Sequence, residues 1–88
     1  MNSVDKKKLR AEAHTLKPVV MIGQSGLTAA VLAELEQTLN SHELIKVKIR
    51  AERDERKVIS EKICIDTGAE LIQTIGQIAV IYRLNPDK

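Results

Sequence analysis

The most regular pattern in this chain is an alternation of apolar and basic residues from position 44 to position 50. Successive side chains of a strand point to opposite faces, so Leu44–Arg50 is predicted to be a strand with one buried face. The other face would carry three cations in a row, Lys46, Lys48 and Arg50. Such a row suits contacts with a phosphate backbone, and it equally suits a solvent-exposed face that resists pairing with foreign strands.

Three further segments have the length and composition of strands. Residues 19–22 are all apolar and lie between Pro18 and Gly23, which predicts a short, fully buried strand. Glu70–Ile75 and Ile78–Arg83 are joined by a two-residue link that contains Gly76. Such a link between two strand-like segments predicts a β-hairpin.

Apolar residues recur at helical spacing in two other segments. Asp5–Leu16 has an apolar stripe, with Ser3 as a candidate N-cap. Ala29–Leu39 has an apolar residue at every fourth position, and Thr28 precedes it as a candidate N-cap. Both segments are predicted to be amphipathic helices that cover a sheet.

The pattern of Val58–Thr67 fits either a helix or a strand. We interpret it as a helix because Gly68 is suited to end one and because a crossover is needed before the hairpin. Asp54 is its candidate N-cap. Cys64 lies within this apolar segment and is expected to be buried and inert.

These elements alternate as helix, strand, helix, strand, helix, strand, strand. Helical crossovers make the first three strands parallel, and the hairpin makes the last one antiparallel. The predicted fold is a two-layer α/β domain with the order α-β-α-β-α-β-β and a four-stranded mixed sheet. With 88 residues, the chain is expected to form a single domain over residues 1–88.

The first strand leads into the second helix through a GxxG loop, Gly23-Gln24-Ser25-Gly26. Unpaired N–H groups and the positive end of the helix dipole favour an anion at such a place. Glycine lets the backbone come close to a phosphate because it has no Cβ atom. The same spacing also fits a simple strand-to-helix turn without a ligand, and the loop alone does not decide between the two.

Composition narrows the functional classes. The chain has no Phe or Trp, so it lacks the aromatic residues on which many single-strand binders stack successive bases. Its net charge of +2 permits nucleic acid binding without requiring it. A single cysteine allows no intramolecular disulfide, and no apolar run has the length of a membrane span. We expect a cytoplasmic protein without a membrane partner.

Basic residues near the N-terminus form a second cationic region. Lys7 and Arg10 lie in the first turns of the predicted first helix, where cations oppose the helix dipole. They are therefore either a phosphate-attracting patch or part of a solvated helix end. Lys17 stands at the start of the first strand, with the GxxG loop at the other end of that strand.

Catalytic and metal-binding patterns are not found in the sequence. The GxxG loop is not a P-loop, because no Lys followed by Ser or Thr comes after its second glycine. The two histidines, one cysteine and Ser25 suggest no nucleophile–base arrangement, and no cluster has metal-ligand spacing. We therefore expect a protein that is not an enzyme and that needs no cofactor, metal or small-molecule substrate.

Four segments together resemble the CRM domain, named for chloroplast RNA splicing and ribosome maturation, and its bacterial stand-alone YhbY-like form. They are the segment 16–20 (Leu-Lys-Pro-Val-Val), the segment 23–28 (Gly-Gln-Ser-Gly-Leu-Thr), the segment 42–48 (His-Glu-Leu-Ile-Lys-Val-Lys) and Gly76 followed by Ile81-Tyr82-Arg83. The resemblance covers nearly the whole chain. It implies a fold similar to the C-terminal domain of translation initiation factor three.

The resemblance also implies RNA binding through a loop similar to that of KH domains, in which the backbone clamps nucleotides. By position, Gly23, Gln24, Ser25 and Gly26 correspond to that loop, and Lys17, Lys46 and Lys48 correspond to the family's basic residues. Many members have a cation within the loop. This chain has none there, so neighbouring lysines would supply the charge.

The sequence thus leads to the hypothesis of a protein that binds ribosomal RNA of large-subunit precursors in ribosome assembly. The alternative is an adaptor that docks on a ribosomal protein or assembly factor through its open sheet face. The oligomeric state is left open by the sequence. The predicted RNA-binding residues are Gly23, Gln24, Ser25, Gly26, Thr28, Lys17, Lys46, Lys48, Arg50, Lys7 and Arg10.

Overall fold

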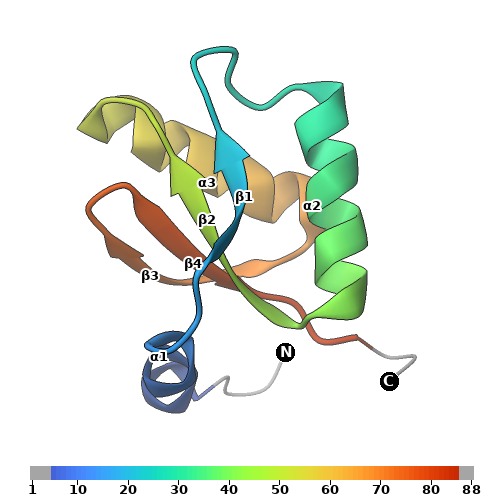
Figure 1. Ribbon diagram of the computed structural model, residues 1–88, viewed down its shortest axis with the longest axis vertical. Helices are drawn as coiled ribbons and strands as arrows, with labels where there is room; N and C mark the ends of the chain where they lie inside the picture. The colour runs from blue at the N-terminus through green and yellow to red at the C-terminus, as the bar shows by residue number, and fades with distance from the viewer. Residues whose placement is uncertain (1–4, 86–88) are drawn as a thin grey trace.

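The computed structural model describes residues 5–85 and contains three helices and four strands within them (Figure 1). The helices are α1 (Lys6–Ala13), α2 (Ala29–Ser41) and α3 (Arg53–Thr67). The strands are β1 (Pro18–Ile22), β2 (Leu44–Ile49), β3 (Glu70–Ile75) and β4 (Ile78–Tyr82). The predicted order α-β-α-β-α-β-β is confirmed.

The strands form one mixed sheet in the order β1-β2-β4-β3. β1 is parallel to β2, whereas β4 is antiparallel to both β2 and β3. The first three strands therefore run in the same direction, as predicted, and β4 lies between β2 and β3. The tight β3–β4 turn places Gly76 at a φ of 55°, a left-handed conformation that glycine adopts without strain.

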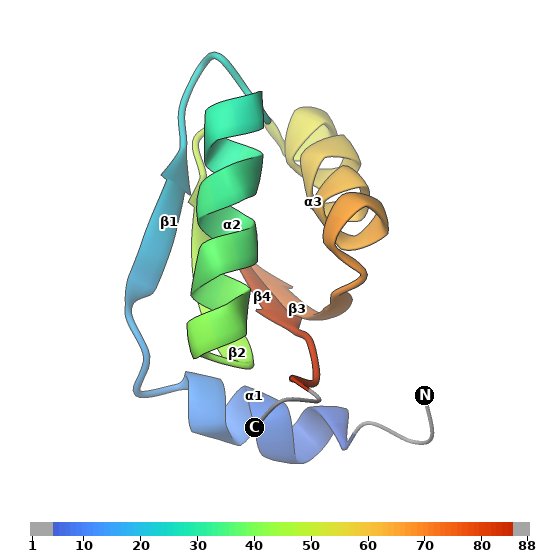
Figure 2. The ribbon, with the colours of Figure 1, turned by 90° about the vertical axis from the view of Figure 1, so that its right-hand side faces the viewer.

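The main core lies between one face of the sheet and helices α2 and α3, which lie on the same side of it (Figure 2). Alternate residues of β1, β2 and β4 point into this core. Its fully buried side chains include Val20, Ile22, Leu35, Leu39, Val47, Ile49, Ile63 and Ile81. This packing confirms the amphipathic helix that was predicted over residues 29–39.

A smaller core lies on the opposite face of the sheet, under α1. Ala13 packs there with Ile72 and Val80, and Leu44 and Tyr82 pack at its border. Helix α1 lies across one end of the sheet and covers only part of this face (Figure 2). The remaining part of the face stays open.

The prediction of a fully buried first strand was wrong. Val20 and Ile22 are buried, but Val19 is 52% exposed and Met21 is 56% exposed. β1 is an edge strand with helices over only one of its faces, so every second side chain points to the open face.

Several helix boundaries differ from the prediction. α1 ends at Ala13 rather than Leu16, because the following N–H groups bond only three residues back, His14 to the Ala11 carbonyl and Leu16 to the Ala13 carbonyl. Its N-cap is Asp5, whose side chain accepts a hydrogen bond from the Lys8 N–H at 3.1 Å. The proposed cap Ser3 lies outside the described residues.

The start of α3 also differs from the prediction. Its N-cap is Glu52, so Asp54 lies inside the first turn and is not the cap. The Arg56 N–H donates to the Glu52 carbonyl at 2.8 Å, which begins the helix two residues earlier. The predicted helix end is confirmed, since Gly68 has a left-handed φ of 75°.

Candidate nucleic-acid interface

The GxxG loop folds as a tight turn between β1 and α2. The Gly26 N–H donates to the Gly23 carbonyl at 3.0 Å, and Gly26 has a φ of 71°. Any other residue at position 26 would be strained in this backbone conformation, although its Cβ atom would meet no other atom within 4 Å. The turn therefore requires a glycine at its second end, and the surface around it is free for a ligand.

Most donors of this loop are unpaired. Within residues 5–85, no hydrogen bond uses the backbone N–H groups of Gln24, Ser25 or Leu27. The side chains of Gln24 and Ser25 are exposed. Thr28 is the predicted N-cap, and its Oγ1 accepts a hydrogen bond from the Val31 N–H at 3.2 Å. The loop thus offers several amide donors next to the positive end of α2.

Arg50 lies beside this loop. β1 and β2 are parallel, so their carboxyl ends meet at one edge of the sheet, and the Arg50 N–H donates to the Ile22 carbonyl at 2.9 Å. Arg50 is exposed and follows β2, which ends at Ile49. The predicted row of three cations on one strand therefore consists of two lysines, with Arg50 next to the GxxG loop instead.

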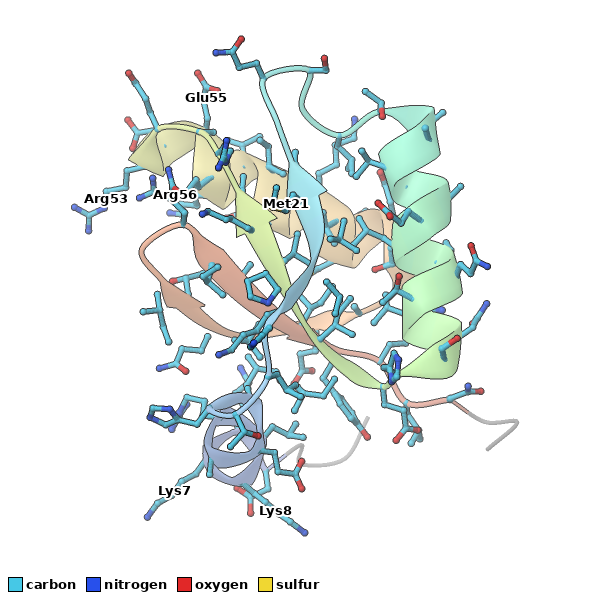
Figure 3. The ribbon with its side chains drawn as sticks, viewed as in Figure 1. Lys7, Lys8, Met21, Arg53, Glu55 and Arg56 are labelled. Carbon is cyan, nitrogen blue, oxygen red and sulfur yellow. The ribbon has the colours of Figure 1, made fainter. Side chains whose placement is uncertain are left out.

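Lys46 and Lys48 lie half-buried on the open face of β2, as the alternation predicted. In the sheet register, Met21 of β1, which Figure 3 labels, is paired with Lys48 of β2. Lys46 is one of the residues that line a cavity of about 200 Å³ between α1 and the sheet, and Arg10 and His14 line it from α1. The structure therefore brings together the predicted residues Arg10 and Lys46.

Two predicted residues do not join this arrangement. Lys7 is exposed on α1 and points away from the sheet, at the opposite end of the molecule from the GxxG loop (Figure 3). Lys17 is exposed just before β1, six residues before Gly23, which corresponds to about 20 Å at the usual rise of a strand. The predicted residues are therefore spread along the molecule and do not form a single cluster around the loop.

Three cations near the loop were missed by the sequence analysis. Arg53, Arg56 and Lys57 lie in the first turns of α3, which follows β2 at the same end of the sheet as the loop. The sequence analysis used this segment only to place the N-cap of the helix and assigned it no role in binding. Parallel pairing of β1 and β2 was the available signal, since it places the residues after both strands side by side.

The surroundings of Cys64 disfavour the thiolate form of its side chain. Cys64 is half-buried on α3 and packs against the main core. Burial, and to a smaller extent the charge of Glu70, raises the pKa of its thiol. A raised pKa lowers the thiolate fraction, so the expectation of an inert cysteine agrees with the structure.

Residues 5–85 contain neither a helix that is long and apolar enough to cross a membrane nor a group of three potential metal ligands. The structure places the unpaired amides of Gln24, Ser25 and Leu27 beside Arg50, and it leaves part of the sheet face with Lys46 and Lys48 open. These features define a small α/β domain in which exposed amide donors lie at the start of a helix.

Comparison with known proteins identifies the family. The family model of the CRS1/YhbY (CRM) domain matches residues 1–83. The chain therefore belongs to the CRM domain family, which confirms the resemblance seen in its sequence.

Similar proteins occur in several bacteria. A probable RNA-binding protein of Pseudomonas aeruginosa is 49% identical, and the match covers 92% of this chain and 79% of the relative. An RNA-binding protein of Haemophilus influenzae is also 49% identical, with 94% and 85% covered. The solution structure of a hypothetical protein of Staphylococcus aureus has a TM-score of 0.81 and 36% identity, covering 90% of this chain and 83% of that one.

Proposed function

We propose that this chain binds RNA, and that the GxxG loop grips the phosphate backbone. The observation that carries the proposal is the set of unpaired amides at Gln24, Ser25 and Leu27, next to the start of α2 and to Arg50. Amide donors at a helix N-terminus bind phosphate oxygens well, and an adjacent guanidinium adds charge. Relatives named as RNA-binding proteins support this proposal.

Further cations extend the proposed contact from the loop along β2. Lys48 and Lys46 follow each other on the open face, and Arg10 shares a cavity with Lys46. Contacts with phosphates carry no sequence information by themselves, so this part of the interface would position the RNA on the protein. We place the weight of the proposal on Arg50, Lys48 and Lys46 rather than on the more distant Lys7 and Lys17.

The proposed RNA is ribosomal RNA in precursors of the large subunit, in the cytoplasm. Support for this finer part comes from the resemblance to the CRM family. Sedimentation of a cell lysate on a sucrose gradient tests it directly. The protein is expected in fractions with large-subunit precursors, and its presence only in slowly sedimenting fractions would contradict this assignment.

The electrostatic part is tested by titrating ribosomal RNA fragments at several salt concentrations. With about three to five phosphates neutralised, the logarithm of the affinity should fall against the logarithm of salt concentration with a slope of about −2 to −4. A response independent of salt would contradict phosphate binding.

The contribution of the loop is tested by the double variant Gln24→Asp, Ser25→Asp. Two carboxylates near a bound phosphate should lower the affinity by about tenfold, because like charges repel across a few ångströms. Both side chains are exposed and unpaired, so the free energy of unfolding should change by less than about 0.5 kcal/mol.

A matched control adds the same charge elsewhere. Ala33→Glu with Gln37→Glu places two carboxylates on the exposed side of α2, away from the loop. The control should bind RNA nearly as well as the unchanged protein. If the loop variant kept the same affinity as this control, the loop would be excluded from the interface.

A second candidate function is an adaptor that docks on a ribosomal protein or assembly factor. The exposed Val19 and Met21 on the open sheet face favour it, since apolar side chains there would be covered by a partner. Nuclease treatment distinguishes the two candidates. An adaptor remains bound to its partner after the RNA is digested, whereas a protein held only by RNA is released.

A further inference from the structure

A groove of about 770 Å³ lies between α3 and the β3–β4 hairpin, and none of the predicted RNA-binding residues lines it. Arg53 and Lys57 line it from the first turns of α3, and Thr74 and Gln77 line it from the hairpin. Its volume falls within the range of sites that hold small organic groups.

The groove lies close to the GxxG loop. The end of β2 separates the two, because the Arg50 N–H donates to the Ile22 carbonyl at 2.9 Å and the Ile49 N–H donates to the Gln77 carbonyl at 2.7 Å. Two strand spacings correspond to about 10 Å between the start of the loop and the hairpin. One continuous polynucleotide strand can span this distance.

The wall formed by α3 is rich in cations. Arg53, Arg56 and Lys57 all line the groove. The guanidinium of Arg56 donates to the Ala51 carbonyl at 2.7 Å, which fixes its position, whereas Arg53 and Lys57 are exposed. Figure 3 shows Arg53 and Arg56 at the end of α3 that faces the hairpin, with Glu55 pointing away. These cations can hold a phosphate at the rim.

The rest of the groove lining contains carboxylates and apolar groups, which a site for phosphate alone would not need. The carboxylates of Asp54 and Glu61 also line the groove, together with the partly exposed apolar side chain of Leu71. Carboxylates repel phosphates but accept hydrogen bonds from the exocyclic amino groups of bases. The Leu71 side chain is an apolar floor that suits the flat face of a base. The lining therefore combines cations for a phosphate with acceptors for a base edge.

We propose that this groove binds one unpaired nucleotide of the RNA strand that the GxxG loop holds. Its phosphate lies against Arg53 and Lys57, and its base lies over the apolar floor with an amino group toward one of the two carboxylates, Asp54 or Glu61. The groove therefore favours bases that carry an exocyclic amino group, such as cytosine, over uracil, which has none. This inference rests on the proposed RNA binding and adds a base preference to it.

The base preference is tested with the full chain and two single-stranded oligonucleotides, one of cytidines and one of uridines, by fluorescence anisotropy at fixed salt. The cytidine oligonucleotide should bind at least about fivefold more tightly, as one good contact to a base edge provides. In the double variant Asp54→Ala, Glu61→Ala, the two oligonucleotides should bind with equal affinity.

The control variant Glu12→Ala, Glu34→Ala removes two exposed carboxylates far from the groove. It should strengthen binding to both oligonucleotides alike and keep the ratio of their affinities. Equal affinity of the unchanged protein for both oligonucleotides would overturn the base preference. A ratio that changes equally in the groove variant and the control would overturn its assignment to the groove.

The phosphate contact is tested by Arg53→Gln with Lys57→Gln, against a control of equal charge, Lys62→Gln with Lys8→Gln. The groove variant should lose several-fold more affinity than the control for either oligonucleotide. Equal losses in the two variants would remove the groove from the interface. If the unchanged protein binds neither oligonucleotide nor ribosomal RNA fragments, the proposed function itself fails, and that outcome is distinct from a failure of the groove alone.

Discussion

The two ends of the sheet use their polar groups in opposite ways. At the end where β4 finishes, the Arg83 guanidinium donates to Glu36 Oε2 at 2.8 Å, to the Thr67 carbonyl at 2.8 Å and to Asn40 Oδ1 at 2.9 Å. At the other end, among the described residues, the amides of Gln24 and Ser25 donate to no protein group. We call these the network end and the loop end.

This difference separates stability from binding. Paired donors at the network end connect β4 to the carboxyl-terminal parts of α2 and α3, so their bonds act between elements far apart in the chain. Unpaired donors at the loop end contribute little to stability, because water satisfies them in both the folded and the unfolded chain. They remain available to a ligand without the loss of an internal bond. The positive charge of a residue therefore does not by itself indicate a role in binding.

Arg83→Met should have the largest effect on stability. The variant removes all the hydrogen bonds of a half-buried guanidinium and leaves the Thr67 carbonyl without that donor. We expect the free energy of unfolding to fall by about 2–4 kcal/mol, as for the loss of charged hydrogen bonds, measured by urea denaturation. RNA affinity of the folded protein should be unchanged. A loss below about 0.5 kcal/mol would show that the network end contributes no more than an exposed surface does.

Arg50→Met tests the loop end with a substitution of the same type. Its side chain is exposed and makes no hydrogen bond within the described residues, so stability should change by less than about 0.5 kcal/mol. Loss of one phosphate contact should instead weaken RNA binding several-fold and make the salt slope less steep by about 1. If Arg50→Met unfolded the protein and Arg83→Met weakened RNA binding, the assignment of stability to the network end and of binding to the loop end would be wrong.

Local patterns in the sequence predicted the elements and their order. The alternation in β2, the glycine between β3 and β4, and Thr28 before α2 each depend on neighbouring residues only, and the structure confirms all three. Packing between distant segments was not predictable in the same way. The exposure of Met21 depends on how much of the sheet α1 covers, and α1 makes its contacts with β2, β3 and β4.

Only the part of the candidate site that is continuous in the chain could be predicted. The GxxG loop is continuous in the chain and could be identified from its spacing. Arg53 and Lys57 belong to it only because β1 and β2 are parallel neighbours, which places the start of α3 beside the loop. The two lysines of β2 were assigned to the correct face, whereas Arg50 lies beyond the strand because β2 ends one residue earlier than expected.

Lys7→Met should have the smallest effect on RNA affinity. It tests the loop end by removing a cation that lies far from it. Lys7 lies in the first turn of α1, where its charge opposes the helix dipole, and it points away from the loop end (Figure 3). We expect RNA affinity to change by less than about twofold, since exposed charges separated by more than a screening length of about 8 Å interact weakly at physiological salt. Stability should rise slightly, by about 0.3 kcal/mol, through the relieved interaction with the dipole.

The matched control for this change is Lys48→Met, which removes the same charge from the open face beside Met21. Its affinity should fall several-fold at the same salt concentration, measured in the same titration. Equal losses for the two variants would mean that RNA contacts α1 as strongly as β2. The interface would then extend over the whole length of the molecule, and the loop end would not be its centre.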